Sequence, residues 1–388
     1  MERKDRLMSL DALRGFDMLW IMGFSSVVTS LCALAGSKDC WLAQQMTHVA
    51  WHGFRHHDTI FPLFLFLAGA SWPFSYAGQV KRGFSTGQIV LRCLRRMLVL
   101  CAIGVFMVGG FFRDLDFGKV RYDSILAHIG ICWCVAAFVY MFVKSWKARL
   151  GIVIGLLGVH WLILGVFRAP DVAALLSSTD PQVAKKVASY AVTGMDNFSF
   201  VGNVAGWIDR AFMPGRLFEG IFDPDGALAK VTGIALAMLG VFAGEVLRKE
   251  SVSGNRKTLL LAGTGAVAVV LTLCLQPFCP VNKKIWTATF VLASAGYAYL
   301  MLSLFYWIID VKGFRKWAFV FMVIGMNSIT IYLLMKVIPF QSVSKYFLDG
   351  VAALGNGAWS AFVIEFGRVV AEWLVLWYLY RKGTFLRV

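Results

Sequence analysis

Long runs of mainly apolar residues, separated by short polar or charged segments, recur along the whole of this 388-residue chain. A helix needs about 20 such residues to cross the hydrocarbon core of a bilayer. The pattern therefore predicts an all-α integral membrane protein, a polytopic bundle of about ten transmembrane helices. The predicted helices cover roughly residues 16–35, 58–78, 92–112, 122–143, 150–167, 227–247, 258–276, 286–309, 317–337 and 358–380.

Lys and Arg residues are concentrated in alternate connections between these runs. Cytoplasmic connections of membrane proteins collect such residues, so we predict that both termini lie in the cytoplasm. The basic segments are residues 3–14, 81–96, 144–149, 248–257, 312–316 and 381–387. One outer connection, about residues 168–226, is long, and connections of that length are usually functional. Without an internal repeat or a soluble stretch, residues 1–388 are predicted to form a single membrane domain.

Composition supports this assignment. Hydrophobic residues make up 59% of the chain and charged residues only 15%, whereas soluble domains carry about 25% charged residues. The formal net charge of +16 is explained by topology, so the predicted partner is the lipid bilayer and not nucleic acid. The N-terminus shows no cleavable signal peptide. The eight cysteines have no metal-ligand spacing, and nucleotide-binding loops and hydrolase elbows are absent.

Four of the six histidines lie in the segment HVAWHGFRHHDTIFPLFLFLAGASW, residues 48–72. His48, His52 and His56 are spaced as ligands on one helix face would be, but Gly53 interrupts that helix and no second ligand cluster exists, so no metal is predicted. Two interpretations stay open at this point: a solvated interfacial turn, or one catalytic imidazole among bystanders. Asp58 is placed to cap the following helix and also to orient an imidazole.

Further polar groups occur near the ends of the apolar runs or inside them. Asp11, Arg14 and Asp17 share one helical face, which suits either an anchor or a cofactor mouth. Positive charge is less expected in outer connections, so the groups around Arg121 and Lys283 either hold an anionic ligand or pair with acidic residues such as Glu219 and Asp223. The polar pair Asn327-Ser328 lies inside a predicted helix, where such groups normally face other helices.

The segment from His48 onward resembles the signature of the transmembrane acetyltransferases typified by heparan-α-glucosaminide N-acetyltransferase. Further blocks that are similar to this family follow in the family's order and cover nearly the whole chain. They are SLDALRGFDML (9–19), KVRYDSIL (119–126), GWIDR (206–210), FDPDGALAKVTGIALAMLGVFAGEVL (222–247), PVNKKIW (280–286), IIDVKG (308–313), GMNSITIYL (325–333) and YRKGTF (380–385).

The resemblance implies a membrane enzyme that takes acetyl from cytoplasmic acetyl-CoA and delivers it to the amino group of a glucosamine-type sugar on the other side. The family's functional histidine corresponds to His48, within H-x-x-W-x-G, and the resemblance gives no role to the three neighbouring histidines. The chain departs from the family where an Asn is replaced by Ser25 or Ser26. It also has Ser124, Ala127 and His128 where the family has a Gly and a Gln-Arg pair. It is further expected to be a bacterial type that lacks the luminal N-terminal domain, located in the inner (plasma) membrane, and the sequence leaves room for a homodimer.

Together these considerations give a set of expected site residues. The expected catalytic residues are His48 and Asp58, the expected acetyl-CoA-binding residues are Arg14, Arg95, Arg96 and Lys312, and the expected substrate-binding residues are Trp51, Arg121, Asn282, Lys283, Asn327 and Ser328. His48 suits either a general base or a nucleophile that carries acetyl. The alternative is a sugar or proton-coupled transporter, because a cluster of His and Asp side chains also suits a proton relay.

Overall fold

A computed structural model describes residues 7–110 and 116–386, and in these ranges the regular structure is helical apart from two isolated β-bridges. The first half contains α1 (Met8–Leu19), η2 (Trp20–Phe24), α2 (Ser25–Leu34), α3 (Trp41–Gln45), η3 (His56–Asp58), α4 (Ile60–Lys81), α5 (Thr86–Ile103), η4 (Gly104–Val108), α7 (Ile125–Phe142), α8 (Trp146–Val166), α9 (Val172–Leu176), α10 (Pro181–Ser189) and η5 (Ala191–Thr193). The second half contains α11 (Val204–Phe212), α12 (Ala227–Arg248), α13 (Gly254–Leu275), α14 (Ala288–Tyr306), η6 (Trp307–Val311), α15 (Phe319–Gly325), α16 (Ser328–Val337), α17 (Phe340–Ala352) and α18 (Gly357–Arg381).

Seven helical segments within the described residues are long and apolar enough to cross a membrane. They are Met8–Leu34, Ile60–Lys81, Ile125–Phe142, Trp146–Val166, Ala227–Arg248, Gly254–Leu275 and Ala288–Val311. The pair α15 and α16, bent by 70°, makes an eighth if it counts as one span. The structure thus confirms a polytopic helical membrane protein, but it supports seven or eight spans and not ten. The remaining two predicted spans correspond to α5 and α18, which are interrupted by charged residues such as Arg96 and Arg368.

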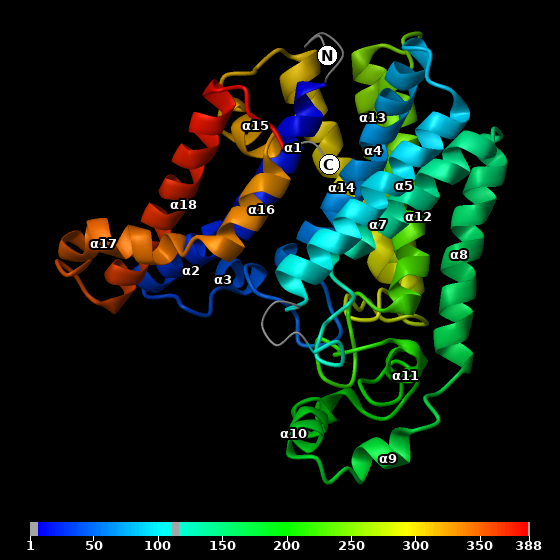
Figure 1. Cartoon of the computed structure of the whole chain (residues 1–388), viewed down its shortest axis with the longest axis vertical. Coiled ribbons are helices and arrows are strands. Elements are labelled where there is room, and N and C mark those ends of the chain that lie inside the picture. The colour runs from blue at the N-terminus through cyan, green and yellow to red at the C-terminus, as the bar shows by residue number, and fades with distance from the viewer. Residues whose placement is uncertain (1–6, 111–115, 387–388) are drawn as a thin grey trace.

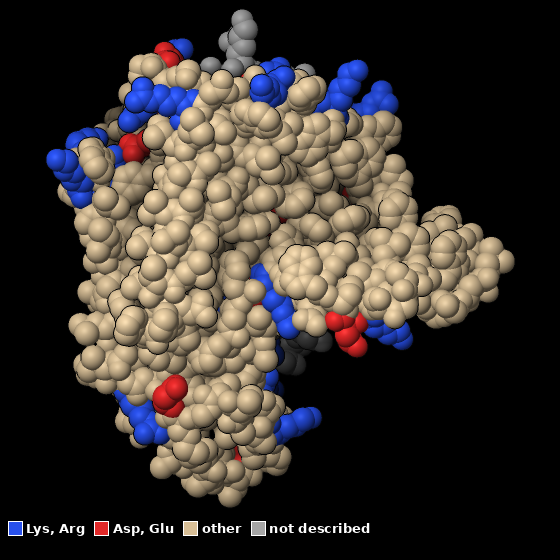
Figure 2. Space-filling view, turned by 180° about the vertical axis from the view of Figure 1, so that it is seen from behind, with Lys and Arg blue, Asp and Glu red and all other residues tan. Residues whose placement is uncertain are grey.

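The long helices run roughly side by side, and the short helices α9, α10 and α11 gather at one end of the bundle (Figure 1). We call residues 168–226 the lobe. At the opposite end of the molecule Lys and Arg side chains gather, and a broad belt almost free of charge lies between the two ends (Figure 2). This distribution is the one that a bilayer-spanning protein needs, because charged side chains are costly in hydrocarbon.

Glycines let the central helices approach closely. A Cβ at Gly69 of α4 would lie 2.0 Å from the Ala237 carbonyl oxygen of α12, and one at Gly240 would lie 2.0 Å from the Phe66 carbonyl oxygen of α4. Small residues at such contacts are typical of membrane helix pairs, where close backbone packing replaces the hydrophobic effect. The segment that follows the histidine cluster is therefore fixed in the middle of the bundle.

The lobe has its own apolar core, although the sequence pattern reads only as a long connection. Phe200, Phe222 and Ile285 are buried there together with Trp51 from the histidine segment. The Trp51 indole N–H donates to the Phe198 carbonyl oxygen at 2.8 Å, and its ring meets those of Phe200 and Phe222 edge-on. The lobe is thus packed directly onto the segment that carries His48.

Candidate active site

The segment between α3 and α4 forms a short turn that positions His48 and Asp58. η3 places His56, His57 and Asp58 just before α4, and the Asp58 Oδ2 accepts the backbone N–H of Arg55 at 3.1 Å. The expectation that Asp58 caps the following helix is therefore wrong. The N-cap of α4 is Thr59, and no side chain in the described part of the chain caps that end. The carboxylate stabilises the preceding turn instead, and its other oxygen is left for the imidazole.

His48 and Asp58 form a close pair. The His48 Nδ1 lies 2.7 Å from the Asp58 Oδ1, the Asp58 side chain is 1% exposed, and the His48 side chain is 53% exposed. A bond this short indicates that the Nδ1–H donates to an ionised carboxylate. That tautomer leaves a lone pair on Nε2, the nitrogen that can take up a proton or attack a carbonyl.

Lys283 completes this group from the loop that precedes α14. Its Nζ lies 3.2 Å from the His48 Nδ1 and 3.6 Å from the Asp58 Oδ1. An ammonium cannot donate to a nitrogen that carries its own proton, so the shorter bond to Asp58 decides the His48 tautomer and Lys283 acts as a counter-charge. Burial opposes ionisation of Asp58, but the hydrogen bond from His48 and the charge of Lys283 outweigh it and hold its pKa below the usual range. The carboxylate therefore stays ionised at neutral pH.

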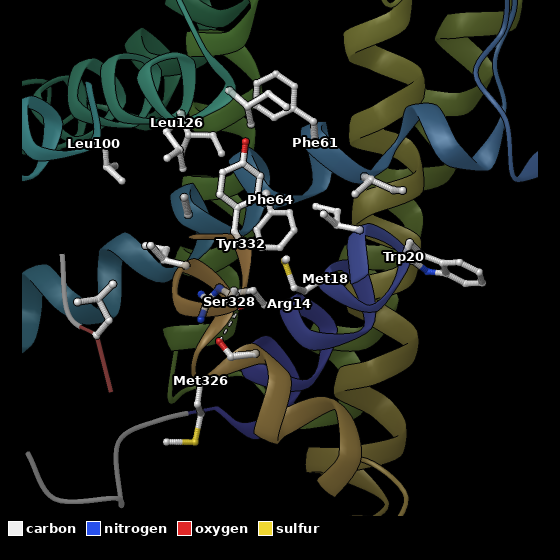
Figure 3. A pocket seen from close by; sticks show the side chains of 18 of the residues that line it. Arg14, Met18, Trp20, Phe61, Phe64, Leu100, Leu126, Met326, Ser328 and Tyr332 are labelled. Carbon is white, nitrogen blue, oxygen red and sulfur yellow. Dashed lines mark hydrogen bonds between the residues drawn. The ribbon is translucent and has the colours of Figure 1, made fainter. Parts of the chain in front are cut away.

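A cavity of about 910 Å³ opens beside His48 and extends into the bundle. Ile60 and Ser75 both line it, and at about 1.5 Å per residue these positions are about 22 Å apart along α4. Its middle is apolar: Figure 3 shows Phe64 and Tyr332 between Phe61 on one side and Arg14 on the other. The cavity therefore connects the lobe end of the bundle with a depth close to the opposite face.

The cavity is lined by cations without lining carboxylates among the described residues. Arg14, Arg96, Lys283 and Arg368 contribute to its wall. Arg14 donates to Ser71 Oγ at 2.9 Å and pairs with Asp11 at 3.0 Å. Arg96 packs over the Trp133 ring at 4.3 Å, and its buried Nε has no hydrogen-bond partner among the described residues. The cavity is long and mostly apolar, and its guanidinium groups have donors that are not satisfied within the described residues. It therefore fits a ligand that has an anionic end and an extended apolar portion.

A break between two helices adds to this environment. α15 and α16 meet at 70°, and Gly325, Met326 and Ser328 at the break line the cavity. The Ser328 hydroxyl donates to the Gly325 carbonyl oxygen at 3.0 Å. Because α16 begins here, its first backbone N–H groups reinforce the positive potential.

Three of the expected substrate-binding residues have structural roles outside the cavity wall. Trp51 is buried in the lobe core. Arg121 makes a bidentate ion pair with Asp223, in which Nε lies 2.8 Å from Oδ2 and Nη2 lies 2.6 Å from Oδ1. Its Nη2 also lies 2.8 Å from the Asp225 Oδ2. The Asn282 Oδ1 accepts the backbone N–H groups of Lys284 and Ile285 and so shapes the turn that presents Lys283.

The other expected residues also divide into two groups. Of the basic residues expected at acetyl-CoA, Arg14 and Arg96 line the cavity, whereas Arg95 and Lys312 are exposed elsewhere. Of the polar pair in the bent helices, Ser328 lines the cavity, and Asn327 is buried against the Thr384 carbonyl oxygen at 3.3 Å.

Among the side chains of the cavity wall that sequence reasoning missed are His57, Tyr332 and Arg368. Arg368 lies in a helix that reads as one more apolar span, and its guanidinium occupies the space where Gly23 has no Cβ. Gly23 has a φ of 106°, a conformation that favours glycine. An Arg inside an apolar run was the available signal, because such residues mark functional interiors. In residues 7–110 and 116–386 no three His, Cys, Asp or Glu side chains are grouped to hold a metal.

The fold and this site define a polytopic helical membrane protein with a histidine–carboxylate pair at a cationic cavity. Residues 6–185 match the family model described as heparan-alpha-glucosaminide N-acetyltransferase, catalytic. The chain is 26% identical over 420 residues to heparan-alpha-glucosaminide N-acetyltransferase of Homo sapiens, which covers 99% of this chain and 60% of the relative. The same enzyme of Mus musculus is 26% identical over 427 residues, covering 99% of this chain and 61% of the relative. The resemblance to this acetyltransferase family is thus confirmed, and the chain spans about three fifths of the length of these relatives.

Proposed function

We propose that the protein transfers an acetyl group from acetyl-CoA to the amino group of a glucosamine-type sugar on the other side of the membrane. One observation carries this proposal: the His48–Asp58 pair and the cations Arg14 and Arg96 open on the same cavity. A thioester whose CoA phosphates are held near the arginines can then extend its acetyl end toward His48. The similarity to the acetyltransferase family supports the same reaction.

Acetyl transfer needs a neutral amine and a stabilised tetrahedral oxyanion. In the proposed reaction the His48 Nε2 takes a proton from the sugar ammonium, the amine nitrogen attacks the thioester carbonyl carbon, and the carbon–sulfur bond breaks. CoA leaves as the thiolate and takes up the proton that the newly acetylated nitrogen releases. A nucleophilic variant places acetyl on Nε2 first, with the amine attacking in a second step. Both routes require the tautomer that Asp58 favours.

The proposed roles of the remaining residues follow from their positions. Arg14 and Arg96 would hold the anionic part of acetyl-CoA, and Lys283 would hold the Asp58 charge close to the reacting centre. Ser328 would contact the ligand in the cavity. Arg95 and Lys312 lie outside the cavity wall and would act only on a part of the ligand that extends beyond it.

The proposed topology is ten spans with both termini in the cytoplasm and the lobe with His48 outside. The asymmetric distribution of Lys and Arg supports it, and α5 and α18 would be two further spans despite their charged residues. In a background with the native cysteines replaced, a cysteine at Lys81 should stay unlabelled by a membrane-impermeant maleimide in intact cells, and one at Lys185 in the lobe should be labelled. Labelling in the reverse pattern would overturn this orientation.

The experiment that tests the function is incubation of the purified protein with radiolabelled acetyl-CoA and a panel of amino sugars. The His48→Ala variant should lose about 10²- to 10⁴-fold in turnover, the usual contribution of a general base. Acetyl-CoA should still raise its melting temperature, because the cations of the cavity remain. His52→Ala is the matched control, since His52 does not line the cavity. Wild-type turnover in His48→Ala would contradict the mechanism.

The bent pair α15 and α16 favours one alternative, a transporter, because broken helices at a central site are typical of secondary transporters. The two functions differ in their ligand response. A transporter of sugars should be stabilised by its solute and not by acetyl-CoA, and it should leave radiolabelled acetyl on CoA.

A further inference from the structure

His57 stands beside His48 at the wall of the cavity. Both side chains line it, and the centres of their rings are 4.5 Å apart, with the ring planes inclined by 55°. The other two histidines of the cluster are outside this wall: His52 contacts Asn282, and His56 contacts Tyr297. The fold thus places His57 at the cavity and keeps His52 and His56 away from it, although the family motif gives none of the three a role.

Ser25, at the start of α2, fixes the orientation of the His57 ring. Its Oγ lies 3.2 Å from the His57 Nδ1, and Ser25 is 7% exposed. This is the hydrogen bond that the structure gives the Ser25 hydroxyl within the described residues. A buried donor without a partner is less tolerable than an acceptor with a spare lone pair. The hydroxyl therefore donates, and Nδ1 accepts.

This hydrogen bond decides the tautomer of His57. Burial, together with the positive charge of the neighbouring Lys283, lowers the pKa of His57 to about 4, so the ring is neutral at pH 7. A neutral imidazole carries one N–H, and with Nδ1 accepting, that proton is on Nε2. The two histidines are therefore complementary: the Nε2 of His48 carries a lone pair, and the Nε2 of His57 carries a proton.

We infer that His57, held by Ser25, donates its Nε2–H to the carbonyl oxygen of the acetyl group while that oxygen becomes negative. This inference rests on the proposed function. No bond of His57 is made or broken: the proton stays on Nε2, and the hydrogen bond strengthens as charge develops. Lys283 is less suited to this task, because its ammonium is on the Nδ1 side of His48 and is paired with Asp58.

The inference predicts a specific kinetic pattern in three variants. His57→Ala should lose about 10²- to 10³-fold in kcat, the usual effect of removing one oxyanion donor, with the KM for acetyl-CoA changed less than threefold. His57→Gln should recover part of the loss, because the amide supplies an N–H. Ser25→Ala should lose kcat in the same direction and by less. His52→Ala is the control and should match the wild type.

Each other outcome has a defined meaning. If His57→Ala keeps kcat within threefold of the wild type, the inference is wrong. If His57→Gln and His57→Ala are equally slow while acetyl-CoA still raises their melting temperatures, His57 serves the shape of the wall and the donor role is likewise wrong. Should His57→Ala fail to fold, the Gln and Ser25 variants decide by the same criteria. A wild-type protein that transfers no acetyl group would instead refute the proposed function.

Discussion

At the scale of single residues, hydrogen bonds orient the two imidazoles of the site differently. Asp58 accepts from the Arg55 backbone with one oxygen and from His48 with the other, and Lys283 approaches the latter. An ionised, buried carboxylate so placed fixes both the orientation and the tautomer of the imidazole. His57 is oriented in a different way, by the hydroxyl of Ser25. Its Nε2 therefore carries an N–H donor, whereas the Nε2 of His48 carries a lone pair.

Asp58→Asn tests the tautomer argument. The amide has nearly the same shape but no charge, and its NH₂ group can hold the His48 Nδ1 as an acceptor, which places the proton on the wrong nitrogen. We expect kcat to fall by about two orders of magnitude or more, as measured by acetyl transfer from radiolabelled acetyl-CoA. Asp116→Asn, at an exposed position of the described chain, provides the matched control. Equal activity of both variants would contradict a role for the carboxylate.

The His57 ring also makes a pH-dependent contribution to stability. Its folded pKa of about 4 lies below the ordinary value of 6.5, so between these values the unfolded chain binds a proton that the folded protein does not. Stability contributed by neutral His57 is therefore present above pH 6.5 and is lost as the pH falls toward 4. Melting in detergent should show a falling temperature across that window, and His57→Gln should reduce the fall. Burial shifts His52 and His56 in the same direction, so a smaller fall should persist in the variant.

At the scale of helices, close backbone contact positions the cavity. Gly15 of α1 packs on α15, where an added Cβ would lie 1.7 Å from the Phe321 carbonyl oxygen, and Gly325 of α15 packs back on Asp11. α1 carries Arg14, and α15 ends at the break that lines the cavity. The spacing of these two helices therefore sets the width of the cavity near Arg14.

Gly15→Ala should force α1 and α15 apart. We expect a loss of about 1–3 kcal/mol in stability, as for other overpacked contacts, together with weaker binding of acetyl-CoA. The matched control is Gly151→Ala in α8, where a Cβ meets open space and should be neutral or stabilise by up to about 1 kcal/mol. Melting temperatures in the same detergent measure both. A Gly15→Ala variant as stable as the wild type would show that the helices can separate freely.

At the scale of the whole molecule, charged side chains lie mainly at the two ends of the bundle, and a few arginines lie in the cavity between them. Basic side chains gather at the end opposite the lobe (Figure 2). Arg14 and Arg96 carry positive charge into the cavity, which they line. An anionic ligand is therefore attracted to that end and drawn toward the bundle interior. At the other end, the lobe packs around Trp51 of the histidine segment.

Arg14→Ala and Arg96→Ala should each raise the KM for acetyl-CoA with a smaller effect on kcat. Loss of one charge-assisted hydrogen bond of about 1.5–3 kcal/mol corresponds to a factor of about 10 to 150. Arg95→Ala is the control, because Arg95 is the adjacent residue on the same helix and lies outside the cavity wall. The KM and kcat of the three variants are measured by steady-state kinetics at fixed ionic strength. Equal effects of Arg95→Ala and Arg96→Ala would mean that only the overall surface charge matters.

Three features follow from the amino-acid sequence alone: the class of the protein, the positions of seven long apolar helices and the family signature. These features are local: a run of apolar residues excludes water whatever lies beside it, and a motif is a matter of spacing. The same locality explains what the pattern did not distinguish. The charged helices α5 and α18 and the bent pair α15 and α16 have the pattern of ordinary apolar spans, and Asp58 has the position of a cap.

The tertiary structure decided which residues meet. Lys283 reaches His48 across 235 positions of sequence, and Arg121 pairs with Asp223 across 102 positions. Among neighbours of equal charge it placed Arg96 in the cavity and Arg95 outside, and among four histidines it placed His48 and His57 together. The physical reason is that burial and hydrogen bonding depend on what packs opposite a side chain. That partner often comes from a segment far away in the sequence, and a local pattern cannot predict where that segment lies.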